Sequence, residues 1–109
     1  MALTSTVLTE TPIKLYQSRG CSAVTTMYIC NASAFTVHFH LYAVMSGGTP
    51  SILNTIYHNV PVQCNDTYVI DSEKLVLEDG DALYANVVIP AGAVISNLPV
   101  IATVSALGV

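Results

Sequence analysis

Hydrophobic and polar positions alternate along most of this chain, as they do in β-strands that bury one face. The clearest stretch is residues 34–44. One face of it would carry Phe35, Val37, Phe39, Leu41 and Ala43, and the other Thr36, His38, His40 and Tyr42. A helix would place His38 in the apolar stripe formed by Phe35 and Phe39, so we interpret the segment as a strand.

Shorter patterns of the same kind predict further strands over residues 13–17, 24–31, 52–62, 67–71, 75–77, 82–89 and 99–107. In residues 24–31 the alternation places Val24, Thr26, Tyr28 and Cys30 on one face and Thr25, Met27 and Ile29 on the other. Turn signals separate the strands, the strongest being Asp79-Gly80.

About eight short antiparallel strands of this kind predict an all-β, single-domain β-sandwich of jelly-roll type, which we place at residues 13–109. Residues 1–12 mix Ser and Thr with single apolar residues and end in Thr11-Pro12. We predict that they form an N-terminal arm, extended or ordered only by neighbouring molecules.

Charge is scarce in the chain, with 3 basic and 7 acidic residues among 109 and a formal net charge of −4. No charged residue lies between Arg19 and Asp66, and none follows Asp81. So few basic residues exclude a dedicated nucleic-acid binder. The uncharged stretches are broken by Gly, Pro and Asn, so they do not predict membrane spans. A surface this neutral indicates a protein covered by copies of itself or by partners.

The three cysteines, Cys21, Cys30 and Cys64, have neither zinc-site spacing nor the even number of a disulfide framework. The first residues lack the features of a signal peptide. We therefore expect a protein that is made and kept in a reducing cytoplasm, at least until it assembles.

Several motifs resemble those of small structural proteins of tailed-bacteriophage virions. They are Tyr28-Ile29-Cys30-Asn31-Ala32-Ser33, Ile56-Tyr57-His58-Asn59, the block from Asp66 to Leu77, and Gly80-Asp81-Ala82-Leu83-Tyr84-Ala85. The resemblance covers residues 16–107 and implies a non-enzymatic β-sandwich present in many copies on a head or tail. The loop at residues 90–99 is longer than this resemblance leads us to expect.

The resemblance and the low charge together predict a decoration or cement protein on the outside of a phage capsid. It would act as a homotrimer that bridges major capsid proteins, without a cofactor, nucleic acid or membrane. Two alternatives stay open: a neck, tail or baseplate component, and a receptor- or carbohydrate-binding module on the virion. The residues proposed for contacts with neighbours are Leu3, Val7, Leu8, Tyr28, Tyr42 and Tyr57.

Candidate chemistry is weak. His38 and His40 could chelate a metal with help from His58, although polar residues on a strand face need no ligand to explain them. Six acids between Asp66 and Asp81 lack calcium-loop spacing and more simply form turns and a charged edge that includes Glu73 and Lys74. No paired carboxylates in a cleft are evident, and Cys30 and Cys64 fit small strand residues better than nucleophiles, so we predict no enzyme.

Overall fold

The computed structural model describes residues 2–71, 75–88 and 100–108. Within these ranges the chain forms strands joined by turns and one short 3₁₀ helix, η1 (Ile52–Asn54). The strands are β1 (Ala2–Val7), β2 (Ile13–Gln17), β3 (Ser22–Asn31), β4 (Val37–Val44), β5 (Thr55–Val62), β6 (Asp66–Ile70), β7 (Leu75–Leu77), β8 (Ala82–Val88) and β9 (Val100–Gly108). The described residues include no helix that is long and apolar enough to cross a membrane.

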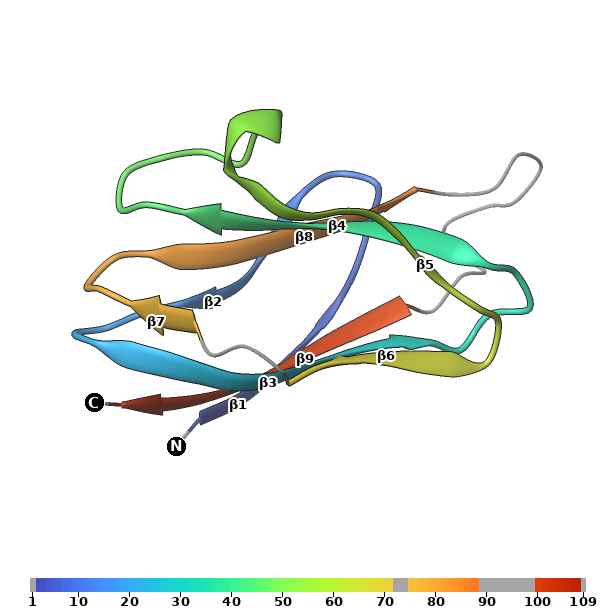
Figure 1. The fold of residues 1–109 in the computed structure, drawn as a ribbon, viewed down its shortest axis with the longest axis horizontal. Helices are drawn as coiled ribbons and strands as arrows, with labels where there is room; N and C mark the ends of the chain where they lie inside the picture. The colour runs from blue at the N-terminus through green and yellow to red at the C-terminus, as the bar shows by residue number, and fades with distance from the viewer. Residues whose placement is uncertain (1, 72–74, 89–99, 109) are drawn as a thin grey trace.

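The strands form two antiparallel sheets packed face to face (Figure 1). The five-stranded sheet has the order β1-β9-β3-β6, with β7 also paired to β3, and the four-stranded sheet has the order β2-β8-β4-β5. Pairing is nested along the chain: β1 pairs with β9, β2 with β8, β3 with β6 and β7, and β4 with β5. This is the topology of a jelly roll, a long antiparallel hairpin rolled into two sheets. The predicted sandwich of jelly-roll type is confirmed.

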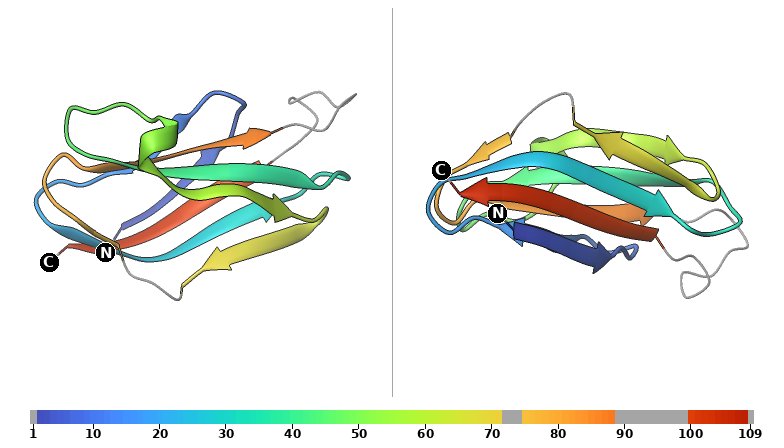
Figure 2. Two further views of the ribbon diagram at one scale, coloured as in Figure 1. Left: turned by 45° about the horizontal axis from the view of Figure 1, so that its top comes forward. Right: turned by 90° about the horizontal axis from the view of Figure 1, so that it is seen from below.

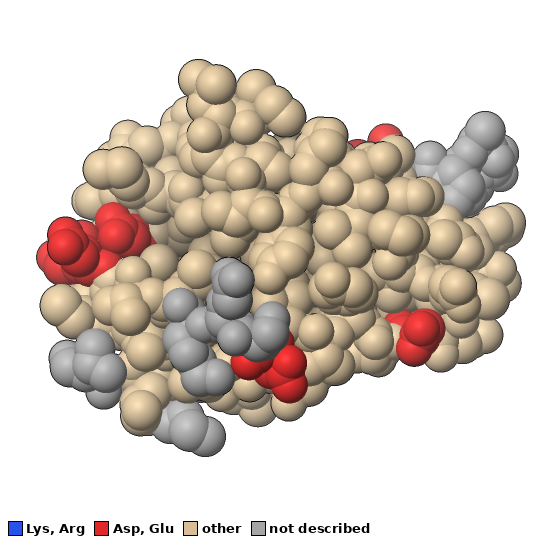
Figure 3. Space-filling view, viewed as in Figure 1, with Lys and Arg blue, Asp and Glu red and all other residues tan. Residues whose placement is uncertain are grey.

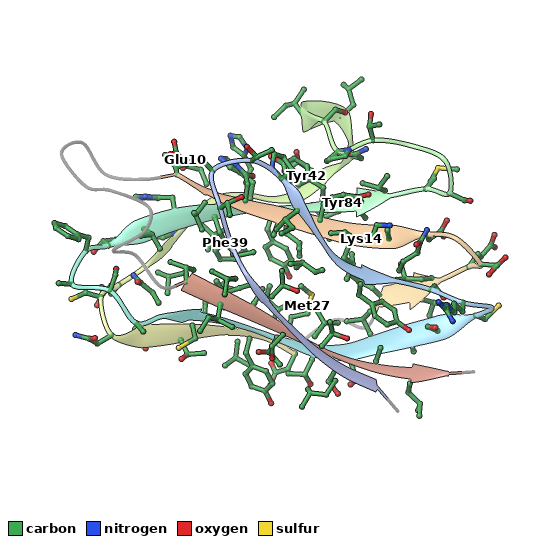
Figure 4. All side chains as sticks on the ribbon, turned by 180° about the vertical axis from the view of Figure 1, so that it is seen from behind. Glu10, Lys14, Met27, Phe39, Tyr42 and Tyr84 are labelled. Carbon is green, nitrogen blue, oxygen red and sulfur yellow. The ribbon has the colours of Figure 1, made fainter. Side chains whose placement is uncertain are left out.

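The core lies between the sheets and uses the strand alternation that the sequence shows. Phe39 and Leu41 of β4 are completely buried, as are Ile29 of β3 and Leu83 of β8. Figure 4 shows Phe39 and Met27 pointing into the space between the two sheets. Burying such side chains contributes about 1.5–3 kcal/mol each, so the inward faces hold the sandwich together.

One predicted face is wrong in β3. The pairing of β3 with β9 shifts register between Val24 and Thr26, which marks a β-bulge at Thr25. The extra residue reverses the alternation, so Val24 is buried together with Met27 and Ile29 rather than opposite them. A pattern of period two cannot reveal such an insertion, because a Thr fits either face.

The start of the strongest predicted strand is also corrected. Strand β4 begins at Val37, and Phe35 lies before it with 46% of its surface exposed. At the other end Val44 is buried and Ala43 only partly so, although β4 stays in register with β8 as far as Val44. The central part of the predicted face, from Val37 to Leu41, is confirmed.

The predicted N-terminal arm is wrong as a description of residues 2–8. Strand β1 pairs with β9 over six residues, from Ala2 opposite Ala106 to Val7 opposite Ile101. Leu8 follows with 1% of its surface exposed, and its backbone N–H donates to the Val100 carbonyl. These residues belong to the sandwich because Leu8 supplies core volume and β1 covers the edge of β9.

The turn at Asp79-Gly80 is confirmed between β7 and β8. Gly80 has a φ of 87°, a conformation that favours glycine, and a Cβ at this position would collide with the Ser46 side chain. The loop at residues 90–99 and the predicted edge residues Glu73 and Lys74 lie outside the described residues.

Candidate functional site

The three histidines lie on the outer face of the four-stranded sheet. His38 and His40 come from alternate positions of β4, and His58 comes from the neighbouring strand β5. The rings of His40 and His58 have centroids 4.6 Å apart. The fold therefore brings His40 and His58 together, as the metal hypothesis requires of two of its three residues.

A hydrogen bond from the backbone determines the tautomer of the neutral His40 ring. The backbone N–H of Asn59 donates to Nδ1 of His40 over 3.1 Å. Asn59 has a φ of 54°, and the β4–β5 pairing is irregular here, so the imidazole satisfies an N–H that the bulged strand leaves without a ladder partner. Because Nδ1 accepts this bond, the neutral ring carries its proton on Nε2.

This arrangement does not favour a metal at the cluster. A metal-bound histidine coordinates through one unprotonated nitrogen and usually donates a hydrogen bond from the other, whereas His40 already uses its unprotonated Nδ1 as an acceptor. Among the described residues, no three His, Cys, Asp or Glu side chains gather closely enough to hold a metal ion. Burial, with smaller contributions from His58 and His38, lowers the pKa of His40 below its ordinary value of 6.5, so the ring is neutral at pH 7.

Tyr42 extends the same outer face and holds the structure together. Its hydroxyl donates to Oδ1 of Asn86 over 2.8 Å, and Nδ2 of Asn86 donates to the Glu10 carbonyl over 3.2 Å. The pair ties the segment between β1 and β2 to the four-stranded sheet. Burial raises the pKa of Tyr42 above 10.0. Figure 4 shows Tyr42, Tyr84 and Lys14 on this sheet and Glu10 beside it.

The acidic residues near the β7–β8 turn bind backbone groups. Oδ1 of Asp79 accepts a hydrogen bond from the Gly20 N–H, and the two carboxylate oxygens of Asp81 accept from the N–H groups of Ser46 and Glu78. These carboxylates hold three turns together at one end of the sandwich. The arrangement matches the turn-forming role that the sequence suggested and gives no support to a calcium site.

Cys30 lies in the other sheet of the sandwich from the histidines. Cys30 is half-buried on the outer face of the five-stranded sheet, whereas all three histidines belong to the opposite sheet. Cys21 and Cys64 are exposed, and all three thiols are free. A Cys30–His nucleophile pair is therefore geometrically impossible in this fold.

Asn31 is a structural residue whose role the sequence analysis missed. Its side chain is completely buried, and Nδ2 donates to the carbonyls of Phe35, Val62 and Gln63 at 2.7, 3.0 and 3.2 Å. Oδ1 accepts from the N–H and the hydroxyl of Ser33. The pattern Asn31-Ala32-Ser33 predicted a turn, but not that its amide also fastens the chain just after β5.

The outward-pointing residues within the strands of the five-stranded sheet are uncharged, and the exposed Asp71 follows β6 directly at the edge of this face. We call this outer face the neutral face, and Figure 2 (right) looks onto it. Strand pairing and burial place on it Leu3, Ser5, Val7, Ala23, Thr25, Thr26, Tyr28, Cys30, Thr67, Val69, Val76, Ile101, Thr103, Ser105 and Leu107. Acidic side chains instead form separate groups, as on the side of the molecule shown in Figure 3.

The structure sorts the residues proposed for contacts with neighbours. Leu3, Val7 and Tyr28 are exposed and lie together on the neutral face. Leu8 is wrong as a contact residue because the core buries it. Tyr57 is half-buried against the core, and Tyr42 is half-buried and bonded to Asn86.

Comparisons with protein-family models, with curated proteins and with solved structures find no match for this chain.

Proposed function

We propose that this chain is a structural protein of a bacteriophage virion, a decoration subunit that binds the outside of the capsid and bridges neighbouring major capsid proteins. The observation that carries the proposal is the extent of apolar surface that this charge-poor fold leaves uncovered. Leu53, Met45 and Leu3 expose 94%, 79% and 71% of their surfaces. Burying such groups against a partner is the main favourable term in protein association.

The arrangement of the exposed apolar groups supports contacts with more than one neighbour. Leu3 belongs to the neutral face, whereas Ile52 and Leu53 form η1, next to the four-stranded sheet. Met45 lines a separate hollow together with Val44 and Leu77. A subunit with apolar contacts on different sides can bridge two proteins, and many modest contacts together give strong attachment.

The described side chains support a mechanical role rather than a chemical one. The grouped polar residues, Asn31 with Ser33, Tyr42 with Asn86, and Asp79 and Asp81, hydrogen-bond to one another or to the backbone. Jelly rolls recur in viral capsid proteins, and the motifs from Tyr28 to Ala85 resemble those of phage structural proteins. Fold alone does not define function, so the proposal depends on a test with particles.

The test is the copy number of the chain in purified virions, measured by quantitative mass spectrometry against the major capsid protein. A decoration subunit should be present in numbers comparable to the capsid protein. A few rings of copies would instead indicate a neck, tail or baseplate component. Absence from purified particles would overturn every virion role, including that of a receptor- or carbohydrate-binding module.

A further inference from the structure

We propose that two copies of this chain pack against each other through their neutral faces, sheet on sheet, to form a two-fold symmetric dimer. The inference deepens the proposed function and rests on it, because it names the partner that covers this face of a docking subunit. It also differs from the trimer expected from the sequence.

The lack of charged strand residues on this face suits a second copy as its occupant. The neutral face spans β1, β9, β3, β6 and β7 without a charged residue among its described members. A partner with charged groups would bury them against it without counterions, which is costly. A second neutral face brings no charged strand residue, so two copies can meet here without burying a charge.

The polar groups of the neutral face are already partly satisfied within it. The hydroxyls of Ser5 and Thr103 lie 3.0 Å apart in a hydrogen bond between β1 and β9. The hydroxyl of Thr25 donates to the Ser105 carbonyl over 3.2 Å. A hydroxyl that keeps a hydrogen bond within the face has a smaller desolvation penalty when water is removed. Two such faces can therefore come into contact at a small cost in free energy.

Apolar side chains surround these hydroxyls. Tyr28 lies near the middle of the face, opposite Thr103 on one side and Val69 on the other. Leu3, Val7, Val76 and Leu107 are exposed farther out, on β1, β7 and β9. A central tyrosine within an apolar surround is an arrangement typical of interfaces between proteins.

The size and shape of the face fit a dimer. The strands β1, β9 and β3 have 6, 9 and 10 residues, and β6 and β7 along the other side of β3 have 5 and 3, so a spacing of about 4.8 Å and a rise of about 3.3 Å per residue give a face of about 500 Å². Two such faces bury about 1,000 Å², the smallest area expected of a specific interface. A surface that packs against itself closes after two copies, so this contact gives a dimer rather than a ring.

The test is sedimentation of the purified full chain over a range of concentrations. Val69 and Val88 form a matched pair, since both are strand valines, exposed by 46% and 44%, but only Val69 lies on the neutral face. Val69→Lys should weaken the dimer at least tenfold, whereas Val88→Lys should sediment like the unmodified chain. Thermal unfolding of both variants confirms that each is folded.

A charge-pairing experiment identifies the partner as a second copy. A two-fold axis through the middle of the face brings the two Tyr28 residues near each other. Tyr28→Lys and Tyr28→Glu should each be monomeric alone and should form a mixed dimer when combined. A chain that is monomeric at every concentration, or a dimer that survives both Tyr28 variants, overturns the inference.

These outcomes are separable from the virion proposal. A monomeric chain found in many copies on purified particles keeps the proposed function and removes the neutral-face dimer. A dimer that is absent from particles removes the proposed function and keeps the self-association of this face.

Discussion

At the scale of the residue, Asn31 is the most informative side chain in this fold. It lies at the end of β3, and its amide donates to the Phe35 carbonyl after β3 and to the Val62 and Gln63 carbonyls at the end of β5. A buried amide with all its hydrogen-bonding capacity used is stabilising only while every partner is present. This explains physically why the Asn-x-Ser pattern stands at that strand end.

We predict that Asn31→Leu lowers the free energy of unfolding by about 2–4 kcal/mol, because it leaves three carbonyls without their donor. Ser33→Ala removes one hydroxyl donor to Asn31 and should cost about 1 kcal/mol. Urea unfolding of both variants measures the difference. Equal midpoints for Asn31→Leu and the unmodified chain would show that the amide bonds contribute nothing.

His40 predicts a dependence of stability on pH. Its pKa in the folded chain is lowered by burial, His58 and His38, so the unfolded chain binds more protons below pH 6.5. The contribution of the neutral ring is therefore complete above pH 6.5 and is lost as the pH falls below that value. Protonation also places a hydrogen on Nδ1, where the Asn59 N–H must donate.

We predict that His40→Asn reduces the loss of stability between pH 7.5 and pH 5, because the amide oxygen can accept from Asn59 but does not titrate. His38→Asn leaves the bond between His40 and Asn59 in place and is the control. The measurement is the free energy of urea unfolding at each pH. The same acid loss in the His40→Asn variant and the unmodified chain contradicts this account.

At the scale of the element, β1 makes the N-terminal segment part of the sandwich. The sequence predicts an arm that can be removed, whereas the structure makes β1 the edge strand of the five-stranded sheet, followed by a buried leucine. Deleting residues 1–10 should therefore expose the edge of β9 and weaken the fold, which reverses the expectation from the sequence.

Leu8 and Val7 give a matched comparison for this element. Leu8→Ala should lower the free energy of unfolding by about 2–5 kcal/mol, because it leaves a cavity between the sheets. Val7→Ala, at a side chain 60% exposed, should change it by less than about 0.5 kcal/mol. Denaturant unfolding of both variants is the measurement. A small effect at Leu8 would mean that the segment is dispensable after all.

Some features of the elements could be predicted from the sequence, and others could not. Alternation along residues 37–41 predicted β4 because each inward side chain there is large and apolar. Alternation failed at Thr25, where the bulge inserts a residue that is compatible with either environment. The polar residues Thr4 and Thr6 conceal the alternation of β1 in the sequence. In the structure both are half-buried and face the sandwich at its edge.

At the scale of the whole molecule, the order of the strands in the two sheets could not be predicted from the sequence. The jelly roll pairs the first strand with the last, and nothing in the local pattern of either strand names its partner. The candidate site shows the same limit. His40 and His58 were selected by residue type, but the bond from Asn59 that defines the chemistry of His40 depends on a bulge between two strands.

The distribution of charge is also a property of the whole molecule. The two long uncharged stretches contain β3 and β9, and strand pairing places the outward residues of β1, β6 and β7 beside them in one neutral face. Residues from Leu3 to Leu107 contribute to it, so the surface does not exist until the chain has folded.

The pairing of β1 with β9 has a consequence for anything attached to the domain. Ala2 lies opposite Ala106, so β1 begins and β9 ends at the same corner of the sandwich (Figures 1 and 2). A tag or fluorescent label joined at either end would therefore occupy nearly the same position in space. A short peptide could also link the two ends into a circular permutant, with new ends opened in the glycine-rich turn at Gly47 and Gly48.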